Sequence, residues 1–248
     1  MVADGVAEGR RIFANTVKYV LMASSSNVGN MFSAAAASLF LPFLPMLPTQ
    51  ILLNNLLYDA GQMTIPTDRV DEELLERPAH WDVRLIRRFM GVFGPISSAF
   101  DFVTFAVLLL LLHAAAPEFR SGWFVESLAT QTLIVFVIRT RRVPFLRSLP
   151  SLPMLVAMIG VAALGVLLPF SFLAEPFGFV PLPLSFLAIL VVLVVAYLVL
   201  AEAVKARFYA VVSAERPIAR RRSRTERRVR RVASRFSHPR RLGGARGG

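Results

Sequence analysis

The feature that most constrains this chain is a series of apolar stretches, each long enough to cross a lipid bilayer. The stretches cover residues 17–41, 46–64, 89–113, 122–138, 152–170 and 183–205, approximately. A helix needs about 20 mainly apolar residues to cross the hydrocarbon core, where every backbone polar group must be bonded internally. The mean hydropathy of +0.58 is far above that of an ordinary soluble domain. The sequence therefore predicts an all-α polytopic membrane protein, folded as a six-helix transmembrane bundle.

The chain divides into three parts of different composition. Residues 1–16 are polar and amphipathic, which predicts a cytoplasmic stalk helix that continues into the first span. Residues 17–209 hold the six spans. Residues 210–248 are predicted to be a disordered, Arg-rich tail, because they contain too little apolar material to fold alone. Residues 216–248 hold thirteen arginines against the single acid Glu226, so they account for the whole net charge of +12.

The basic residues predict the orientation in the membrane. The links near 42–48, 114–121 and 171–182 contain one basic residue, Arg120, whereas the N-terminal segment, the other links and the tail contain the rest. Since basic loops stay in the cytoplasm, both termini are predicted to be cytoplasmic in a multi-pass protein of the plasma membrane. An even number of spans agrees with this.

Charged links and one aromatic residue are expected to mark the borders of the membrane. The link at 65–88 is rich in acids and arginines, and the link that begins near Arg139 is rich in arginines. Both are predicted to be aqueous loops. Trp123, at the start of the fourth span, is predicted to lie at the interface.

The first two spans contain polar residues that bilayer helices normally exclude. Asn27 and Asn30 are spaced i,i+3, and Asn55 and Asp59 are spaced i,i+4, so each pair lies on one face of its helix. Polar side chains at mid-membrane usually face a bundle interior. A short turn with three prolines joins the spans, so the two faces are predicted to converge on one hydrated cation.

Each of these residues has a structural alternative. Asp59 is favoured as a cation ligand over a helix-capping or interhelical carboxylate, whereas the asparagines are as well explained by interhelical hydrogen bonds. Asp101, in the third span, is a further candidate for the ion path. Glu126 and Gln131 are weaker candidates. Asn54 points about 100° away from Asn55 on a helix, so it is assigned to interhelical bonding.

The ligand types favour one cation over another. Mg²⁺ sheds water reluctantly and is often held by one or two carboxylates with several waters retained. Amide oxygens with a single carboxylate therefore suit a partly hydrated Mg²⁺ better than a dehydrated Ca²⁺.

Several motifs resemble P-type cation ATPases. SSNVG at 25–29 and NLLYD at 55–59 are similar to the fifth and sixth membrane helices of these pumps, although Asn30 and Tyr58 replace the Glu and Thr of calcium pumps. The longer motifs resemble the magnesium-transporting P-type ATPases: EGRRIFANTVKYV, ASSSNVGNMFSA, FLPMLPTQILLNNLLYDAGQ, RFMGVFGPISSAFDFVTFAV, SGWFVESLATQTLIVFVIRT and PLPLSF. The resemblance runs from about Gly5 to Tyr209 and leaves out the tail.

The resemblance implies that the chain is the C-terminal membrane part of such a pump, its helices five to ten. Mg²⁺ would be the transported ion, and Asp59 would occupy a ligand position. No aspartate here precedes a lysine, so the phosphorylated Asp-Lys-Thr-Gly-Thr sequence of these pumps is absent. ATP would then act only through domains on a complementary chain. The chain is expected to be inactive alone, as a truncated product or one half of a split pump.

Two other functions remain open on the sequence. The chain could be a non-transporting membrane anchor whose tail binds anionic lipid or an acidic partner, at about 1 kcal/mol per basic residue near the surface. It could also belong to a pump for Ca²⁺ or another cation. Nucleic-acid binding by the tail has no support from aromatic spacing, since Phe236 stands alone.

Overall fold

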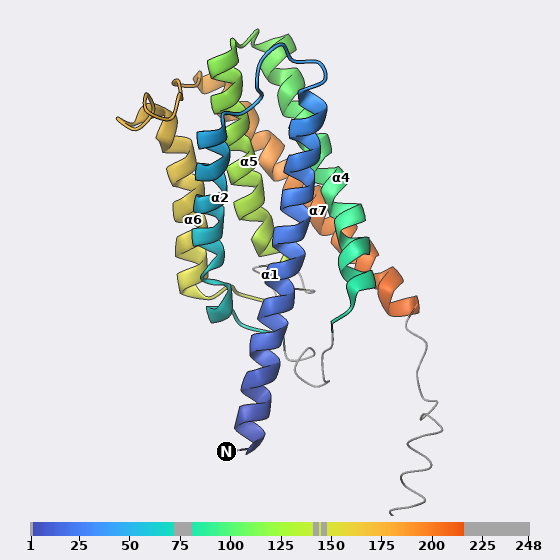
Figure 1. Ribbon diagram of the computed structural model, residues 1–248. Helices are drawn as coiled ribbons and strands as arrows, with labels where there is room; N and C mark the ends of the chain where they lie inside the picture. The colour runs from blue at the N-terminus through green and yellow to red at the C-terminus, as the bar shows by residue number, and fades with distance from the viewer. Residues whose placement is uncertain (1, 72–80, 141–143, 145–147, 216–248) are drawn as a thin grey trace, which may run out of the picture. The chain divides into compact units, whose positions relative to one another are not determined.

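The computed structural model describes residues 2–71, 81–140, 144 and 148–215, and within these every regular element is a helix (Figure 1). The elements are α1 (Val2–Ala37), α2 (Pro48–Gln62), η1 (Ile65–Thr67), α4 (Val83–Ala106), η2 (Val107–Leu111), α5 (Ala116–Ile138), α6 (Leu152–Leu167), η3 (Leu168–Phe170) and α7 (Leu184–Glu215). The described residues up to Ala206 form one compact unit.

Four described helices are long and apolar enough to cross a membrane. They are Val83–Leu111, Ala116–Ile138, Leu152–Phe170 and Leu184–Val212. The hairpin of α1 and α2 does not meet the same criterion. Helix α2 has 15 residues, which corresponds to about 22 Å at 1.5 Å per residue. The predicted all-α membrane bundle is confirmed, whereas the exact borders of its spans stay a prediction.

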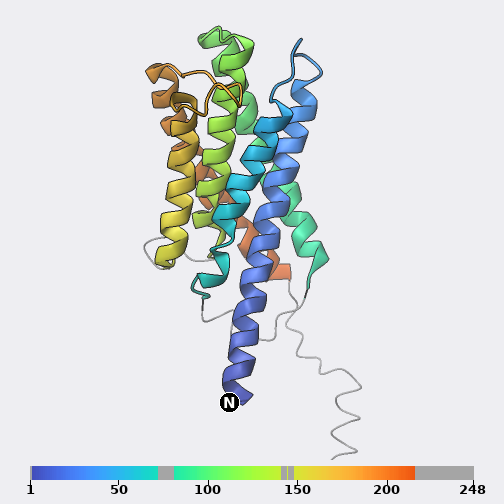
Figure 2. The same cartoon turned by 60° about the vertical axis from the view of Figure 1, so that its left-hand side comes forward.

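Helix α5 is the centre of the bundle. It packs against α1, α2, α4 and α6, and both views in Figures 1 and 2 show it surrounded by other helices. Nearly all of its side chains from Phe119 to Ile138 are buried, including the serines, threonines and Gln131. A helix with polar residues on all sides is stable in a membrane only if protein covers it. The central position of α5 therefore follows from its composition.

Prolines and a glutamine shape the turn of the α1–α2 hairpin. Pro48 occupies the first turn of α2, where its missing N–H is not needed. Gln50 accepts a hydrogen bond from the backbone N–H of Leu47 at 3.0 Å. Its amide nitrogen donates to the carbonyls of Phe177 and Gly178 at 3.0 and 3.3 Å. The hairpin turn is thus fastened to the link that precedes α7.

Helices α1 and α4 approach each other closely at a glycine. A Cβ added to Gly29 would lie 3.0 Å from the Cβ of Ser97 and 3.3 Å from the carbonyl oxygen of Gly94. The Ser98 hydroxyl donates to the carbonyl of Gly29 at 3.0 Å. Small residues at such crossings allow membrane helices to pack backbone to backbone.

We expect Gly29→Val to separate α1 from α4 and to lower the free energy of unfolding by about 1–3 kcal/mol, as overpacking does elsewhere. Gly91→Val is the matched control, because it lies inside α4 with no atom within 4 Å of an added Cβ. Thermal unfolding of the chain in detergent compares the two variants. Equal losses of stability would show that the close approach at Gly29 is not needed.

A buried ion cluster lies where α1, α5 and the chain after η1 meet. Asp68 accepts hydrogen bonds from Lys18 Nζ at 3.0 Å and from Arg139 Nε at 2.9 Å. The backbone N–H of Ser151, the N-cap of α6, also donates to Asp68 at 3.3 Å. The Asp68 side chain is fully buried, and those of Lys18 and Arg139 are 7% and 1% exposed. One carboxylate therefore connects four separate parts of the fold.

Parts of the two links that were expected to be aqueous loops, at 65–88 and after Arg139, are buried in this region. Asp71 is buried and accepts hydrogen bonds from the hydroxyls of Thr140 at 2.8 Å and Ser148 at 3.2 Å. Arg139 also donates to the carbonyls of Ser148 and Leu149, each at 3.0 Å. The three charged side chains Asp68, Asp71 and Arg139 are buried and not solvated, because Asp68 and Arg139 pair with each other and Asp71 accepts hydrogen bonds from hydroxyls. Residues 72–80 lie outside the described residues.

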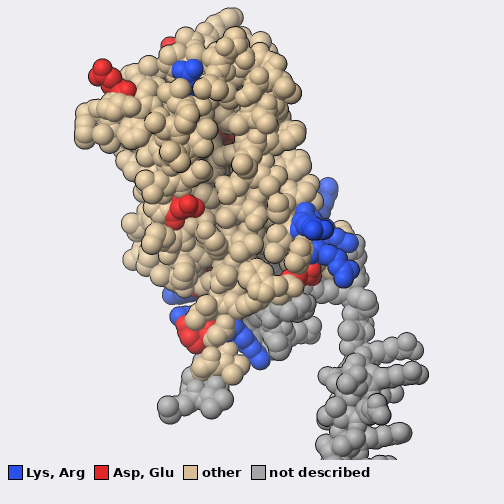
Figure 3. Space-filling view, in the orientation of Figure 1, with Lys and Arg blue, Asp and Glu red and all other residues tan. Residues whose placement is uncertain are grey.

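The distribution of charged side chains on the surface fits a protein whose middle lies in the membrane. Figure 3 shows few charged side chains on the middle of the drawn face, while Lys and Arg side chains gather toward its lower end. Uncharged surface suits contact with lipid, and basic surface suits the cytoplasmic side. The predicted disordered tail covers residues 210–248, but α7 continues to Glu215, so residues 210–215 are helical and that part of the prediction was wrong. Residues 216–248 lie outside the described residues.

Candidate functional site

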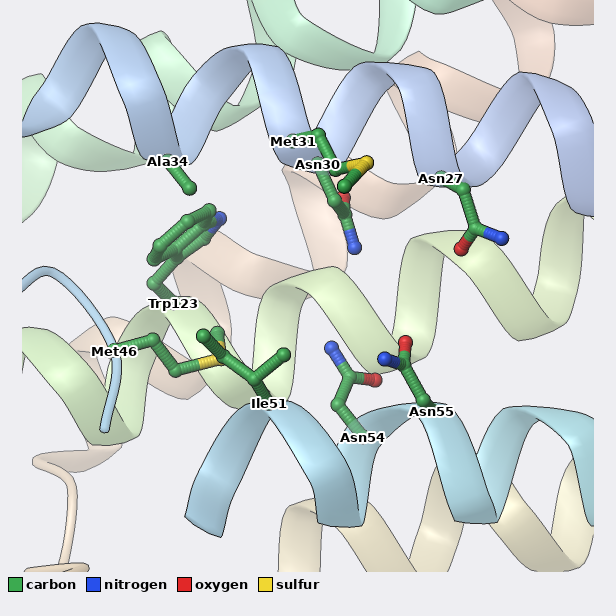
Figure 4. A pocket seen from close by; sticks show the side chains of 9 residues that line it. All are labelled: Asn27, Asn30, Met31, Ala34, Met46, Ile51, Asn54, Asn55 and Trp123. Atoms are coloured by element: carbon green, nitrogen blue, oxygen red, sulfur yellow. The ribbon is translucent and has the colours of Figure 1, made fainter. Parts of the chain in front are cut away.

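A cavity between α1, α2 and α5 collects most of the asparagines, and its volume is about 470 Å³. It is lined by Asn27, Asn30, Met31, Ala34, Met46, Ile51, Asn54, Asn55 and Trp123. Figure 4 shows the amide groups of the four asparagines projecting into the space between α1 and α2, with the Trp123 ring at one end. We call this cavity the asparagine pocket.

The four asparagines form a gradient from the surface to the core. Asn27 and Asn55 are exposed, Asn30 is half-buried and Asn54 is buried. The asparagines of α1 therefore face those of α2 across the pocket. A ligand that entered from outside would meet Asn27 and Asn55 first.

Ser127 of α5 holds the inner side of the asparagine pocket. Its Oγ accepts from Asn30 Nδ2 at 2.9 Å, from Asn54 Nδ2 at 3.2 Å and from Gln131 Nε2 at 2.7 Å. A hydroxyl oxygen has two lone pairs, so it cannot serve three donors equally well. The cluster therefore has more donors than acceptors at its centre.

Two amide oxygens of the same cluster have no partner. Among the buried atoms that the structure describes, Asn54 Oδ1 and Gln131 Oε1 accept no hydrogen bond. A buried polar atom without a partner costs about 1–3 kcal/mol. Neutral oxygens of this kind are ligands that hard cations such as Mg²⁺ and Ca²⁺ accept. In the described part of the chain no group of three His, Cys, Asp or Glu could hold a metal instead.

Asp101 lies behind the wall of the asparagine pocket. Its carboxylate accepts from the Ser33 hydroxyl of α1 and from Trp123 Nε1 at 3.0 Å. Glu126 is buried as well, and its Oε2 has no partner among the described atoms. Asp101 therefore orients the Trp123 ring and does not line the pocket.

Asp59 lies apart from the asparagine pocket. Its side chain is exposed and lines a different cavity between α1 and the end of α2. The structure thus brings Asn27, Asn30 and Asn55 to one pocket, places Asp101 behind it, and puts Asp59 one turn further along α2. Their role as metal ligands stays a prediction.

Sequence reasoning set aside or missed three polar residues of this site. Asn54 was assigned to interhelical bonding, and it does make such a bond, but it also lines the pocket. Ser127 by itself does not stand out in the sequence, and Gln131 is only a weaker candidate there. These two are spaced i,i+4 on α5, so a shared polar face was visible in the sequence. Trp123 is 2% exposed, so its ring contacts protein and not lipid headgroups, while its depth in the membrane stays a prediction.

Comparisons with known proteins identify the family of the chain. Residues 43–207 match the family model described as the C-terminus of cation-transporting ATPases. The chain belongs to the cation-transporting ATPase family. Its members include the magnesium-transporting P-type ATPase 1 of Escherichia coli K12, which is 49% identical over 209 residues. The corresponding protein of Salmonella typhimurium strain 14028s is also 49% identical over 209 residues.

The matches cover most of this chain but only a small part of each relative. The match takes in 83% of this chain but only 23% of the Escherichia coli and Salmonella proteins. A putative cation-transporting ATPase of Methanocaldococcus jannaschii is 25% identical over 170 residues, which are 67% of this chain and 20% of that protein. The chain therefore spans about a quarter of the length of its relatives. Family membership and the apolar helices make it a multi-pass membrane protein.

Proposed function

We propose that this chain forms the cation pathway of a magnesium-transporting P-type ATPase. The observation that carries the proposal is the asparagine pocket, where amide groups from α1 and α2 converge on Ser127 and leave buried oxygens without donors. The named activity of the relatives with 49% identity supports Mg²⁺ as the ion. The few carboxylates of the site also suit an ion that keeps part of its water.

The pocket supports a stepwise entry of the ion. Asn27 and Asn55 are exposed and would receive a hydrated Mg²⁺, whose bound waters donate to the amide oxygens. Six waters occupy about 180 Å³ at about 30 Å³ each, so the cavity has room for the hydrated ion. Further inside, the oxygens of Asn54 and Gln131 would replace some of these waters. Asp101 would hold the Trp123 ring in place at one end of the asparagine pocket.

ATP hydrolysis would be supplied by another chain. On this proposal the chain has no ATPase activity alone and pairs with a complementary chain that carries the phosphorylation and nucleotide-binding domains. Movement there would tilt the stalk at residues 1–20 and change the spacing of α1 and α2 at the pocket. Both termini would face the cytoplasm, and the Arg-rich tail would lie on anionic lipid of the plasma membrane.

Magnesium-limited growth tests this function. The chain is expressed together with the complementary half of a magnesium pump in a strain that lacks Mg²⁺ uptake. Wild type is expected to restore growth, and Asn30→Ala or Asn54→Ala is expected to lower Mg²⁺ uptake about tenfold or more. Ser38→Ala is the control, because that exposed hydroxyl bonds only to its own helix. Absence of rescue by wild type, or full rescue by both site variants at equal membrane levels, would contradict transport through this pocket.

A further inference from the structure

Another cavity of the described chain is lined by polar residues that are not part of the asparagine pocket. It has a volume of about 400 Å³ and lies between α1, the end of α2 and η1. Its lining residues are Ile12, Asn15, Thr16, Tyr19, Asp59, Gln62, Met63, Ile65 and Pro66. We call it the Gln62 pocket. No Lys or Arg is among these described lining residues, so Asp59 is the one full charge on its wall.

Gln62 is the residue that points to a ligand. It is 1% exposed, and neither its amide oxygen nor its amide nitrogen has a hydrogen-bond partner among the described atoms. A buried glutamine with both ends unbonded is unfavourable by about 1–3 kcal/mol for each group. A buried polar group of this kind calls for a partner outside the protein, such as a bound ion or water.

Asn15 adds a second free oxygen from the opposite helix. Its amide nitrogen donates to the backbone carbonyls of Pro66 and Asp68, each at 3.2 Å, which orients the side chain. Its Oδ1 is left without a partner. The side chain is 3% exposed. Two fixed amide oxygens and one carboxylate thus come from α1 and α2 on the walls of one cavity.

The chemistry of these groups matches a hydrated divalent cation. Waters bound to a cation are hydrogen-bond donors, so they need the acceptors that Asn15, Asp59 and Gln62 provide. The volume of about 400 Å³ exceeds the roughly 180 Å³ of six waters at about 30 Å³ each. A single carboxylate attracts the cation electrostatically, and the cation can keep most of its bound water.

We propose that the Gln62 pocket is a second site for a divalent cation, which holds the ion with its water before it reaches the asparagine pocket. Asn55 of the asparagine pocket and Asp59 of the Gln62 pocket are four residues apart on α2, which is about 6 Å along the helix axis. The backbone of Asp68 in the ion cluster bonds Asn15, so the Gln62 pocket lies at the predicted cytoplasmic end. This role as an antechamber rests on the proposed function, whereas the binding site itself does not.

Binding of Mn²⁺ to the full chain in lipid nanodiscs tests the proposal, with free Mn²⁺ measured by electron paramagnetic resonance. Wild type is expected to bind Mn²⁺, and Mg²⁺ is expected to displace it. Gln62→Leu is expected to weaken one class of sites about tenfold, and Gln62→Glu to tighten it severalfold through the added charge. Because neither end of the Gln62 amide has a hydrogen-bond partner among the described atoms, Gln62→Leu should fold. Glu8→Gln removes an exposed carboxylate outside the cavity and is the control.

The outcomes separate this site from the proposed function. If Gln62→Leu and Gln62→Glu both bind Mn²⁺ as wild type does, or if wild type binds none, the second site is overturned. If Gln62→Leu weakens binding while Asn30→Ala leaves it unchanged, the second site stands and ion binding in the asparagine pocket fails. If Gln62→Leu weakens one class of sites and Asn30→Ala weakens another, both the second site and ion binding in the asparagine pocket are supported.

Discussion

Asp68→Ala is expected to destabilise the membrane bundle by about 3–5 kcal/mol, which is the largest effect of any single substitution proposed for this chain. The alanine would leave the buried charges of Lys18 and Arg139 without their shared carboxylate. A buried charge without a partner must either lose its proton or draw in water, and Arg keeps its proton. The N-cap region of α6 would also lose its bond from Ser151.

Thermal unfolding in detergent, together with protease resistance in membranes, measures this effect. Glu8→Gln is the control, since the Arg11–Glu8 pair is about half exposed and such pairs contribute less than about 1 kcal/mol. The triple variant Lys18→Met, Asp68→Leu and Arg139→Met should recover much of the loss, because apolar residues can replace a buried ion cluster. If Asp68→Ala unfolds at the wild-type temperature, the cluster does not hold the helices together.

Ser127→Ala is expected to weaken divalent-cation binding in the asparagine pocket about tenfold or more, as loss of supporting residues does at other metal sites. The hydroxyl of Ser127 orients the amides of Asn30, Asn54 and Gln131. Without it the three amides would turn more freely, so their oxygens would no longer be held for the ion. A loss of about 1–3 kcal/mol in stability should accompany the change, because buried amide N–H groups lose their acceptor.

Two measurements on Ser127→Ala separate these effects. Mn²⁺ titration in nanodiscs reports binding, and thermal unfolding reports stability. Ser38→Ala is again the control, since it removes a serine hydroxyl that bonds to the carbonyl of Ala34 on the same helix. A variant that loses stability but binds Mn²⁺ with wild-type affinity would assign Ser127 to helix packing alone.

Much of the fold was predictable because it depends on local properties of the chain. The length and apolarity of stretches such as Leu152–Phe170 predict a membrane helix wherever they occur. Helix periodicity places Asn27 and Asn30 on one face, and the prolines near Pro45 force a short turn. The convergence of α1 and α2 at a polar pocket could be expected on this basis. The motifs that resemble P-type ATPases also predicted the family.

Other features depend on how each helix is rotated against its neighbours, which residue spacing alone does not specify. A rotation of one residue, about 100°, decides that Asn54 is buried while Asn55 is exposed. Asp59 lies one turn further along α2 than Asn55 and lines a different cavity. Asp68 and Arg139 look like loop charges in the sequence, yet they are buried because each meets the other from a distant part of the chain. Periodicity assigns residues to a face, but only the packing of neighbouring helices selects what that face contacts.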